Sequence, residues 1–546
     1  MLDRAAGASK FGYHPKCKRL GLTHLSFADD LMVLSDGKIR SVEGIMEVFE
    51  DFSRHSGLKI SLEKSTLYMA GIPPMVKQEI ADKFPFEVGQ LPVRYLGLPL
   101  VTKRLSVADY TPLLEQLKKR IASWTSRFIS YAGRLNLITS VLGSICNFWM
   151  AAFRLPRQCI REIDKLCSAF LWSGTDMSSK KAKVSWSNVC KPKTEGGLGL
   201  RSLTEANDVC GLKLVWRIIS KSTSLWVKWI NTYLLRRKSF WTLKQSTSMG
   251  SWIWKKILKY REVAKSFTKV DVGNGNSVSF WFDNWSNLGR LADIVGERGF
   301  VDLGISKEAT VAEALTRRRR RPHRVSLLND IEENLRSIWQ QQRKEEDTML
   351  WKGKNDGFQE HFSTKETWEQ IRATSPMVSW HKEVWFTHAT PKYAFCTWLV
   401  VQDRLSTGDR MVKWNGSASG DCVFCNSPET RDHLFFSCNF TSVVWAALVS
   451  GLWKTRQTST WPQILSSISS QSQDRVKGFL LRYVLQATIY TIWRERNNRR
   501  HGEAHNSPAT LIGWIDKQVR NQITTIRRMR DRRYDMASQI WLSTRA

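Results

Sequence analysis

Three cysteines and one histidine lie within 17 residues of the chain, at Cys422, Cys425, His433 and Cys438. Thiolate and imidazole groups are the ligands that zinc prefers, and three cysteines with one histidine form an established tetrahedral set. The chain has only 10 Cys and 10 His among its 546 residues, so a chance cluster is the weaker explanation. Because all four ligands come from the protein, we predict a closed, structural Zn²⁺ site.

A pair of adjacent carboxylates, Asp29 and Asp30, lies between two apolar runs, Leu25–Phe27 and Leu31–Leu34. Aspartate is common in tight turns, where water solvates it. Carboxylate oxygens are also the ligands that divalent cations require, and paired metal ions can clamp the oxygens of a phosphoryl transfer. The residue types alone leave both interpretations open.

The elements around these residues predict an α+β fold. Residues 21–37 have the pattern of strand, tight turn and strand, with the carboxylates at the tip. A helix is expected around residues 42–55, and short strands near residues 58–67 and 94–100. From about residue 111 to residue 220 apolar residues recur at helical spacing. Residues 272–285 look like a turn that leads into a strand.

The charge balance is unusual, because 83 Lys and Arg face 50 Asp and Glu, a formal net charge of +33. Such an excess of positive charge favours a polyanionic partner and argues against an enzyme whose substrates are small metabolites. A charge run without any partner is the alternative, and the run of five arginines could also act as a nuclear import signal. The candidate phosphate contacts are Arg317, Arg318, Arg319, Arg320, Arg321, Arg527, Arg528, Arg530, Arg532 and Arg533.

The first residues, MLDRAAGASK, lack the apolar segment of a secretory leader, and ten cysteines in so long a chain do not form a disulfide scaffold. The apolar run at residues 135–153 is interrupted by polar residues, so we expect a core helix there. We therefore expect a protein of the nucleus or cytoplasm that is neither secreted nor embedded in a membrane.

The segment HLSFADDLMVLSDG, which contains the Asp pair, resembles the F/Y-x-D-D box of reverse transcriptases, in the form found in plant LINE-type non-LTR retrotransposons. The following HSGLKISLEKST is similar to the next palm segment, with Lys64 at the position of its lysine. Tyr95-Leu96-Gly97 resembles the box at the palm–thumb junction. The Cys/His cluster and its surroundings, including Trp385 and Trp398, are similar to the zinc-binding module of these enzymes.

The resemblance implies the C-terminal part of a palm at residues 1–105, a helical thumb-like region at 106–220 and a Trp-rich connection with an Arg-rich linker at 221–350. A reverse transcriptase zinc-binding domain at 360–445 and a basic helical tail at 446–546 would follow. It implies that Asp29 and Asp30 are Mg²⁺ ligands if any polymerase activity remains, and that Lys64 contacts nucleic acid. The implied partners are RNA, DNA or an RNA–DNA hybrid, with deoxynucleoside triphosphates as the small-molecule substrate of an active enzyme.

The family needs a third carboxylate on an earlier palm strand, and here only 26 residues precede Phe27 of the box, with Asp3 the single acid among them. We therefore expect an N-terminally truncated and inactive polymerase that still binds nucleic acid and zinc. An active reverse transcriptase with a metal ligand supplied from elsewhere, and an element relic without function, are the alternatives. Residues 447–546 show no acidic constellation like that of ribonuclease H, so we predict no cleavage of an RNA strand.

Overall fold

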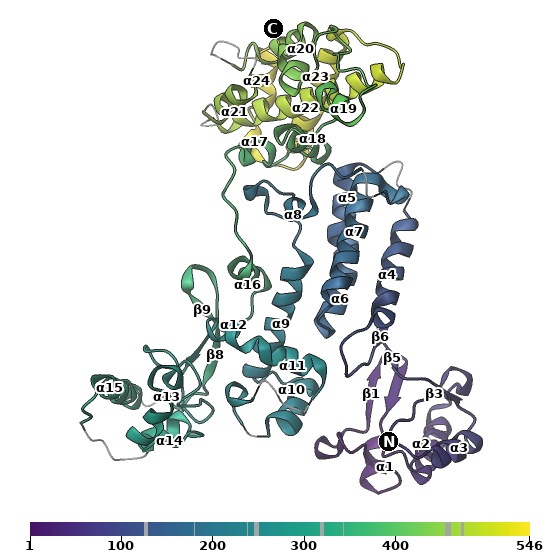
Figure 1. Ribbon diagram of the computed structural model, residues 1–546, viewed down its shortest axis with the longest axis vertical. Helices are drawn as coiled ribbons and strands as arrows, with labels where there is room; N and C mark the ends of the chain where they lie inside the picture. Colours follow the sequence, from purple (N-terminus) through teal and green to yellow (C-terminus); the bar gives the residue numbers. More distant parts are fainter. Residues whose placement is uncertain are drawn as a thin grey trace. The chain divides into compact units, whose positions relative to one another are not determined.

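The computed structural model describes residues 1–124, 129–178, 181–236, 238–244, 250–316, 322–341, 343–453, 460–470 and 474–545 (Figure 1). Helices dominate and the sheets are small, which confirms the α+β class. The chain divides into two compact units. Unit 1 comprises Met1–Tyr110, Trp149–Pro156 and Glu205–Arg372, and unit 2 comprises Thr111–Phe148, Arg157–Thr204 and Ala373–Ala546.

The first part of unit 1 contains the predicted hairpin and helix. β1 (His24–Phe27) pairs antiparallel with β2 (Asp30–Val33), in a register that sets Phe27 opposite Asp30. The amphipathic helix α2 (Ile39–Ser56) buries Val42 and Val48 on its apolar side and ends at Gly57, whose φ of 74° suits glycine. The other elements are α1 (Leu2–Gly7), η1 (Lys18–Leu20), η2 (Leu62–Lys64), β3 (Thr66–Leu67), α3 (Pro74–Lys83), β4 (Glu87–Val88), β5 (Arg94–Tyr95) and β6 (Leu98–Pro99).

The second part of unit 1 is built around a three-stranded antiparallel sheet of β7 (Thr268–Asp271), β8 (Thr348–Lys352) and β9 (Phe358–Gln359). Trp351 and Trp281 are completely buried in two apolar clusters beside the sheet, so these tryptophans are core residues. The helices are α9 (Leu203–Ile219), α10 (Leu225–Ile230), η8 (Asn231–Leu235), η9 (Phe240–Thr242), α11 (Trp252–Lys259), α12 (Arg261–Lys265), α13 (Leu291–Asp302), α14 (Val311–Thr316), α15 (Ser326–Gln341), η10 (Lys354–Asp356) and α16 (Thr364–Ile371).

One expectation for unit 1 is wrong, because residues 272–285 form no named strand. The backbone N–H groups of Gly273 and Gly275 donate to one carboxylate oxygen of Asp347, at 2.9 and 2.8 Å. The N–H and hydroxyl of Ser277 donate to the other oxygen, both at 2.9 Å. Residues 273–277 therefore wrap around a carboxylate. Beyond them Ser279 forms an isolated antiparallel bridge with Thr310, and its N–H donates to the Asp283 carboxylate at 2.7 Å, so the chain turns before a longer strand forms.

Unit 2 is helical in its described residues. Its longest helix, α22 (Arg475–Arg500), packs against α18 (Pro391–Val401), α20 (Asn439–Val449) and α23 (Pro508–Arg528). The remaining elements are α5 (Tyr131–Leu137), η4 (Ile138–Leu142), α7 (Arg157–Ser173), η5 (Gly174–Asp176), α8 (Trp186–Val189), η7 (Lys193–Glu195), α17 (His381–Val384), α19 (Gly408–Trp414), η11 (His433–Ser437), α21 (Trp461–Ser470), η13 (Arg532–Tyr534) and α24 (Ala537–Ser543), with α4 (Val107–Ala122) and α6 (Gly143–Ala152) crossing the unit boundaries in sequence.

The continuous helical stretch Tyr131–Ala152, made of α5, η4 and α6, is the one described helix whose length and composition would allow it to cross a membrane. Core helices of globular proteins pass the same test, so this finding is weak support for a membrane span. Localisation in the nucleus or cytoplasm stays a prediction.

Candidate metal centre and nucleic-acid interface

The predicted zinc ligands come together in unit 2. Cys422 and Cys425 lie on a tight turn, in which Asn426 N–H donates to the Cys422 carbonyl at 2.9 Å and Cys422 N–H donates to the Ser427 carbonyl at 2.8 Å. Asn426 adopts a φ of 61°, the left-handed conformation that closes the turn. His433 begins η11, and Cys438 directly precedes α20.

The four ligand atoms lie within 4.8 Å of one another. The Sγ atoms of Cys422 and Cys438 are 3.9 Å apart, close to the edge of about 3.8 Å of a tetrahedron with zinc–sulfur bonds of about 2.3 Å. Cys425 Sγ is 3.1 Å from His433 Nε2. Donor types and spacing therefore fit a zinc ion. In such a site the metal would link the turn to the start of α20. It would leave no coordination position for a substrate.

The environment of Cys438 favours the thiolate that a zinc ion needs. The hydrogen bond from Cys422, together with the N–H groups of Phe440 and Thr441 at the start of α20, lowers the pKa of the Cys438 thiol to about 5 against the opposing effect of burial. The same contact with Cys438 raises the pKa of the Cys422 thiol. One thiol is thus already poised as a ligand, and metal binding would displace the remaining thiol protons.

The turn of the Cys/His cluster is also attached to the C-terminal helices. The Phe424 ring, between the two cysteines of the turn, stacks on Phe440 with centroids 4.6 Å apart and an interplanar angle of 1°. The Arg499 guanidinium lies 4.7 Å from the first ring and 4.6 Å from the second. Glu495 and the carbonyl of Asn506 hold that guanidinium, at 2.9 and 2.8 Å. The end of α22 therefore supports the cluster.

A buried ion pair makes a second attachment between these two segments. Glu429, four residues before His433, is fully buried, and both its oxygens accept bonds from Arg496, at 3.1 and 2.5 Å. The N–H of Gly408 donates to the same carboxylate at 2.7 Å. Neither this pair nor the Arg499 contact was predicted from the sequence. The one available signal was the spacing of Arg496, Arg499 and Arg500, which falls on one side of a helix.

The carboxylates of the predicted polymerase box lie at the tip of the β1–β2 hairpin. Ala28, with a φ of 52°, and Asp29 form the two-residue turn, and Asp30 is the first residue of β2. Both aspartates are exposed to solvent. Asp3 does not join them, since it accepts a hydrogen bond from Thr23 at 2.5 Å, before the start of β1.

Among the residues that the structure describes, the Cys/His cluster is the one group of three or more potential metal ligands. Asp29 and Asp30 therefore form no three-ligand group with another described acid or histidine. Paired Mg²⁺ ions in phosphoryl transfer are held by several oxygen ligands, so two exposed aspartates do not by themselves fit such a centre.

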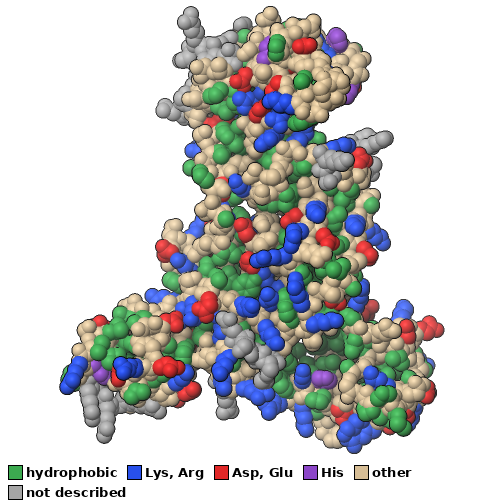
Figure 2. All heavy atoms as spheres, in the orientation of Figure 1, with side chains coloured by type: hydrophobic (Ala, Val, Ile, Leu, Met, Phe, Trp, Pro, Cys, Tyr) green, Lys and Arg blue, Asp and Glu red, His purple; other side chains and the backbone are tan. Residues whose placement is uncertain are grey.

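The predicted nucleic-acid contacts divide into three groups. Lys64 is exposed at the end of η2 in unit 1. The run from Arg317 to Arg321 lies outside the described residues. In the tail, Arg533 forms a 2.6 Å ion pair with Asp531, whereas the other four arginines are exposed and have no carboxylate within 4.0 Å in the described part of the chain: Arg527, Arg528, Arg530 and Arg532. Figure 2 shows more basic than acidic side chains on the visible face.

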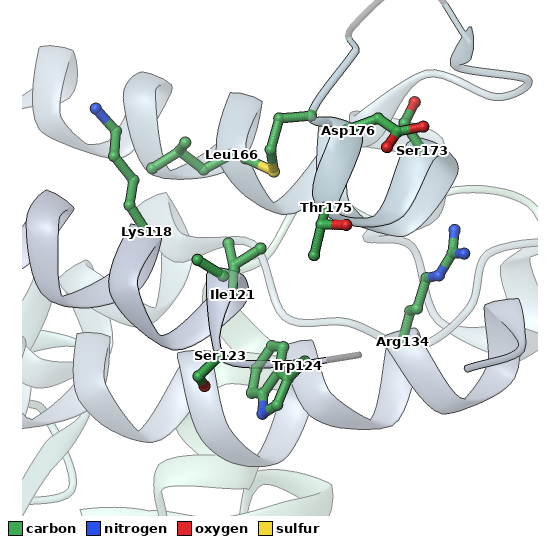
Figure 3. A pocket seen from close by; sticks show the side chains of 11 residues that line it. Lys118, Ile121, Ser123, Trp124, Arg134, Leu166, Ser173, Thr175 and Asp176 are labelled. Carbon is green, nitrogen blue, oxygen red and sulfur yellow. The ribbon is translucent and has the colours of Figure 1, made fainter. Parts of the chain in front are cut away.

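Unit 2 also contains a hollow of about 1080 Å³ between the ends of α4, α5 and α7 (Figure 3). Lys118 and Arg134 line it together with the Trp124 side chain. The Trp124 ring lies 5.1 Å from that of Phe170, so it belongs to the packing of these helices. The structure assigns no ligand to this hollow.

Comparison with known proteins identifies the two segments. The family described as reverse transcriptase (RNA-dependent DNA polymerase) matches residues 8–100, and the family described as zinc-binding in reverse transcriptase matches residues 362–445. An Arabidopsis thaliana relative named "Putative ribonuclease H protein At1g65750" is 26% identical over 379 residues, covering 64% of this chain and 58% of the relative. "Uncharacterized mitochondrial protein AtMg00310", also from Arabidopsis thaliana, is 27% identical over 137 residues, covering 25% of this chain and 88% of the relative.

The present chain thus spans little more than half the length of the first relative. The hairpin with Asp29 and Asp30 falls inside the first family match, and the Cys/His cluster falls inside the second. Both matches confirm the resemblance that the sequence motifs indicated. Two separate segments of the chain are thus similar to reverse transcriptase families, and these matches support a plant retrotransposon reverse transcriptase.

Proposed function

We propose that this chain is a retrotransposon-derived RNA-directed DNA polymerase that binds RNA or an RNA–DNA hybrid, carries one structural zinc ion and does not polymerise by itself. Residues 8–100 match the reverse transcriptase family, which implies nucleic-acid binding and supports the polyanionic partner that the net charge of +33 indicates. We further propose that it acts in the nucleus or cytoplasm.

The zinc proposal rests on the geometry of the Cys/His cluster, which is the single observation that carries most weight. Four donors of the right type converge within 4.8 Å, inside the segment that matches a zinc-binding family. The ion would be structural, because the turn and the start of α20 together supply all four ligands. Its role is to hold unit 2 in the form that presents its basic residues.

The nucleic-acid proposal is supported by the exposed arginines at the end of α23 and after it. Arg527, Arg528, Arg530 and Arg532 are solvated cations, and none has a carboxylate within 4.0 Å among the described residues. Cations of this kind bind phosphates by releasing counterions, independently of sequence. We expect non-sequence-specific binding that weakens steeply with salt.

The proposed lack of polymerase activity is supported by the exposed aspartates at the hairpin tip. In the described residues Asp29 and Asp30 gather no third ligand. In-line phosphoryl transfer depends on metal ions held in a fixed geometry. Cleavage of RNA is not proposed either, and the ribonuclease name belongs to a relative of which the chain spans 58%.

The test is a primer-extension assay on an RNA template with Mg²⁺ or Mn²⁺, run with the zinc-loaded chain and with the Asp29→Ala/Asp30→Ala variant. Binding of labelled RNA and of an RNA–DNA hybrid is measured in parallel across a salt titration. We expect no extension by either protein, saturable binding by both, and a linear dependence of log K on log salt concentration. The hybrid should remain uncleaved.

Primer extension that disappears in the aspartate variant would refute the proposed lack of polymerase activity. It would mean that a further metal ligand completes the site. Absence of saturable binding by zinc-loaded protein would refute the nucleic-acid proposal. A chain without any bound zinc after purification with the metal would refute the structural role of the cluster.

A further inference from the structure

One cationic side chain of unit 2, Lys183, is half-buried and has no carboxylate beside it. Its Nζ donates a hydrogen bond to Ser406 Oγ at 3.1 Å, and among the described residues no carboxylate oxygen lies within 4.0 Å of this atom. An ammonium group has three N–H donors. Burying such a charge without a counter-charge is costly, so the site is suited to receive an anion.

A second cation, Arg410, belongs to the same neighbourhood. Its Nε is buried without a hydrogen-bond partner in the described part of the chain. The nearest carboxylate, that of the half-exposed Asp403, is 3.9 Å from Nη1. Arg410 and Arg496 are close enough to Lys183 that both add to the effect of burial, which lowers the pKa of that lysine. Positive charges therefore gather here beyond what the local acids neutralise.

The acid that could neutralise this group is already engaged elsewhere. Glu429 accepts two bonds from Arg496 and one from the Gly408 N–H, and Arg496 also donates to the Ser406 carbonyl at 3.1 Å. The loop that carries Ser406 is thereby fixed. The Ser406 hydroxyl accepts from Lys183, which leaves its own proton free to be donated to a ligand.

We propose that Lys183 Nζ, Ser406 Oγ and the Arg410 guanidinium together bind one phosphate group of a nucleic-acid backbone. A tetrahedral phosphate has several acceptor oxygens, which match an ammonium, a hydroxyl and a guanidinium better than a single carboxylate would. The site rests on the proposed nucleic-acid binding and places one contact of that binding beside the zinc module. The same chemistry would take free phosphate, and the experiment separates the two sources.

The test compares the zinc-loaded full-length chain with Lys183→Gln, Ser406→Ala and the matched control Lys181→Gln. Lys181 is exposed on the same segment and lies 3.8 Å from Asp176, so the control removes an equal charge outside the site. Binding of a labelled single-stranded RNA of mixed sequence is measured by fluorescence anisotropy over a salt titration. Zinc content and circular dichroism establish that each variant is folded.

We expect Lys183→Gln to weaken RNA binding roughly tenfold at about 100 mM salt and to reduce the log–log salt slope by about 0.7, the value for one phosphate contact on a single strand. Ser406→Ala removes a neutral hydroxyl, so it should weaken binding about threefold and leave the slope unchanged. Lys181→Gln should stay within about twofold of the unmodified chain. If Lys183→Gln does not fold, Ser406→Ala decides.

A second arm measures the melting temperature in inorganic phosphate against chloride of the same ionic strength, because a bound anion stabilises the folded chain. RNA binding that is equal in the unmodified chain and in both site variants overturns the phosphate site, while the proposed function stands. If the unmodified chain binds no RNA but gains phosphate stabilisation that Lys183→Gln lacks, the site holds free phosphate and the proposed function fails. If the unmodified chain shows neither RNA binding nor phosphate stabilisation, both the phosphate site and the proposed function are overturned.

Discussion

The buried pair of Glu429 and Arg496 predicts a large and specific loss of stability when one partner is removed. In Arg496→Leu the carboxylate loses donors at 3.1 and 2.5 Å and keeps only the Gly408 N–H at 2.7 Å. Glu429 is fully buried, so no water replaces the lost donors. Leaving a buried charge uncompensated costs about 3–5 kcal/mol. Leucine keeps part of the apolar contact that the Arg496 stem makes.

The matched control is Arg520→Leu, which removes the same side chain from a partly exposed pair. Arg520 lies 2.6 Å from Asp516 on α23, and 57% of its side chain is exposed. Solvent screens such a pair, so we expect a loss below about 0.5 kcal/mol. In Arg520→Leu the remaining carboxylate keeps some access to water and the Trp541 N–H at 2.8 Å, whereas in Arg496→Leu the remaining carboxylate is fully buried and the Ser406 carbonyl also loses a donor.

The assay is urea unfolding of the zinc-loaded chain. Unfolding is monitored by the release of zinc to a chromophoric chelator and by circular dichroism. Zinc release reports on unit 2 alone, because the Cys/His cluster lies within it. We also expect the double variant Arg496→Leu/Glu429→Leu to cost clearly less than the sum of the two single losses, since no charge is left buried. A loss below about 1 kcal/mol in Arg496→Leu, or strict additivity in the double variant, would refute the buried pair.

Four further predictions concern other parts of the chain. Removing zinc with a chelator should lower the melting temperature of unit 2 and decrease its helical circular dichroism signal, and readded zinc should restore both. Asp29→Asn/Asp30→Asn should change the free energy of unfolding by less than about 0.5 kcal/mol, because both side chains are exposed at the hairpin tip; a larger loss in denaturation would show a buried role. Asp347→Asn should cost about 1–3 kcal/mol in urea unfolding, since the amide offers a single acceptor to the loop that the carboxylate now holds with four bonds. Burial raises three thiol pKa values to about 12 and shields the sulfur atoms, so alkylation followed by mass spectrometry should be slow at pH 8 in the folded chain and fast in urea; the thiols are Cys146, Cys159 and Cys396.

Local patterns in the sequence were enough to predict the hairpin and the metal cluster. The strands flank Ala28 and Asp29 because apolar runs end on both sides of a turn. The cluster was recognisable because its ligand types are rare in the chain and lie within 17 residues. Both features depend on contacts between residues that are near each other in the sequence.

The partners of the cluster were not predictable in the same way. Glu429 and Arg496 are 67 residues apart, and Asp347 is 70 to 74 residues from the N–H groups that donate to it. A charged residue that will be buried looks the same in the sequence as one that will be solvated. The strand expected within residues 272–285 is reduced to an isolated bridge at Ser279, whose N–H donates to Asp283, while the distant Asp347 accepts from the N–H groups of the preceding turn.

The basic tail consequently contains two kinds of arginine with different physical roles. Arg496 neutralises Glu429, Arg499 covers two phenylalanine rings beside the metal ligands, and Arg500 donates to the carbonyls of Ser419 and Asp421 at 2.9 and 3.3 Å. These guanidinium groups are engaged in contacts within the folded chain and cannot also release counterions from a phosphate backbone. The salt dependence of RNA binding should therefore reflect only the exposed arginines near the end of α23 and uncompensated sites such as that of Lys183. The net charge of +33 would predict a very steep slope of log K against log salt concentration. A measured slope of that size would contradict this division of the tail.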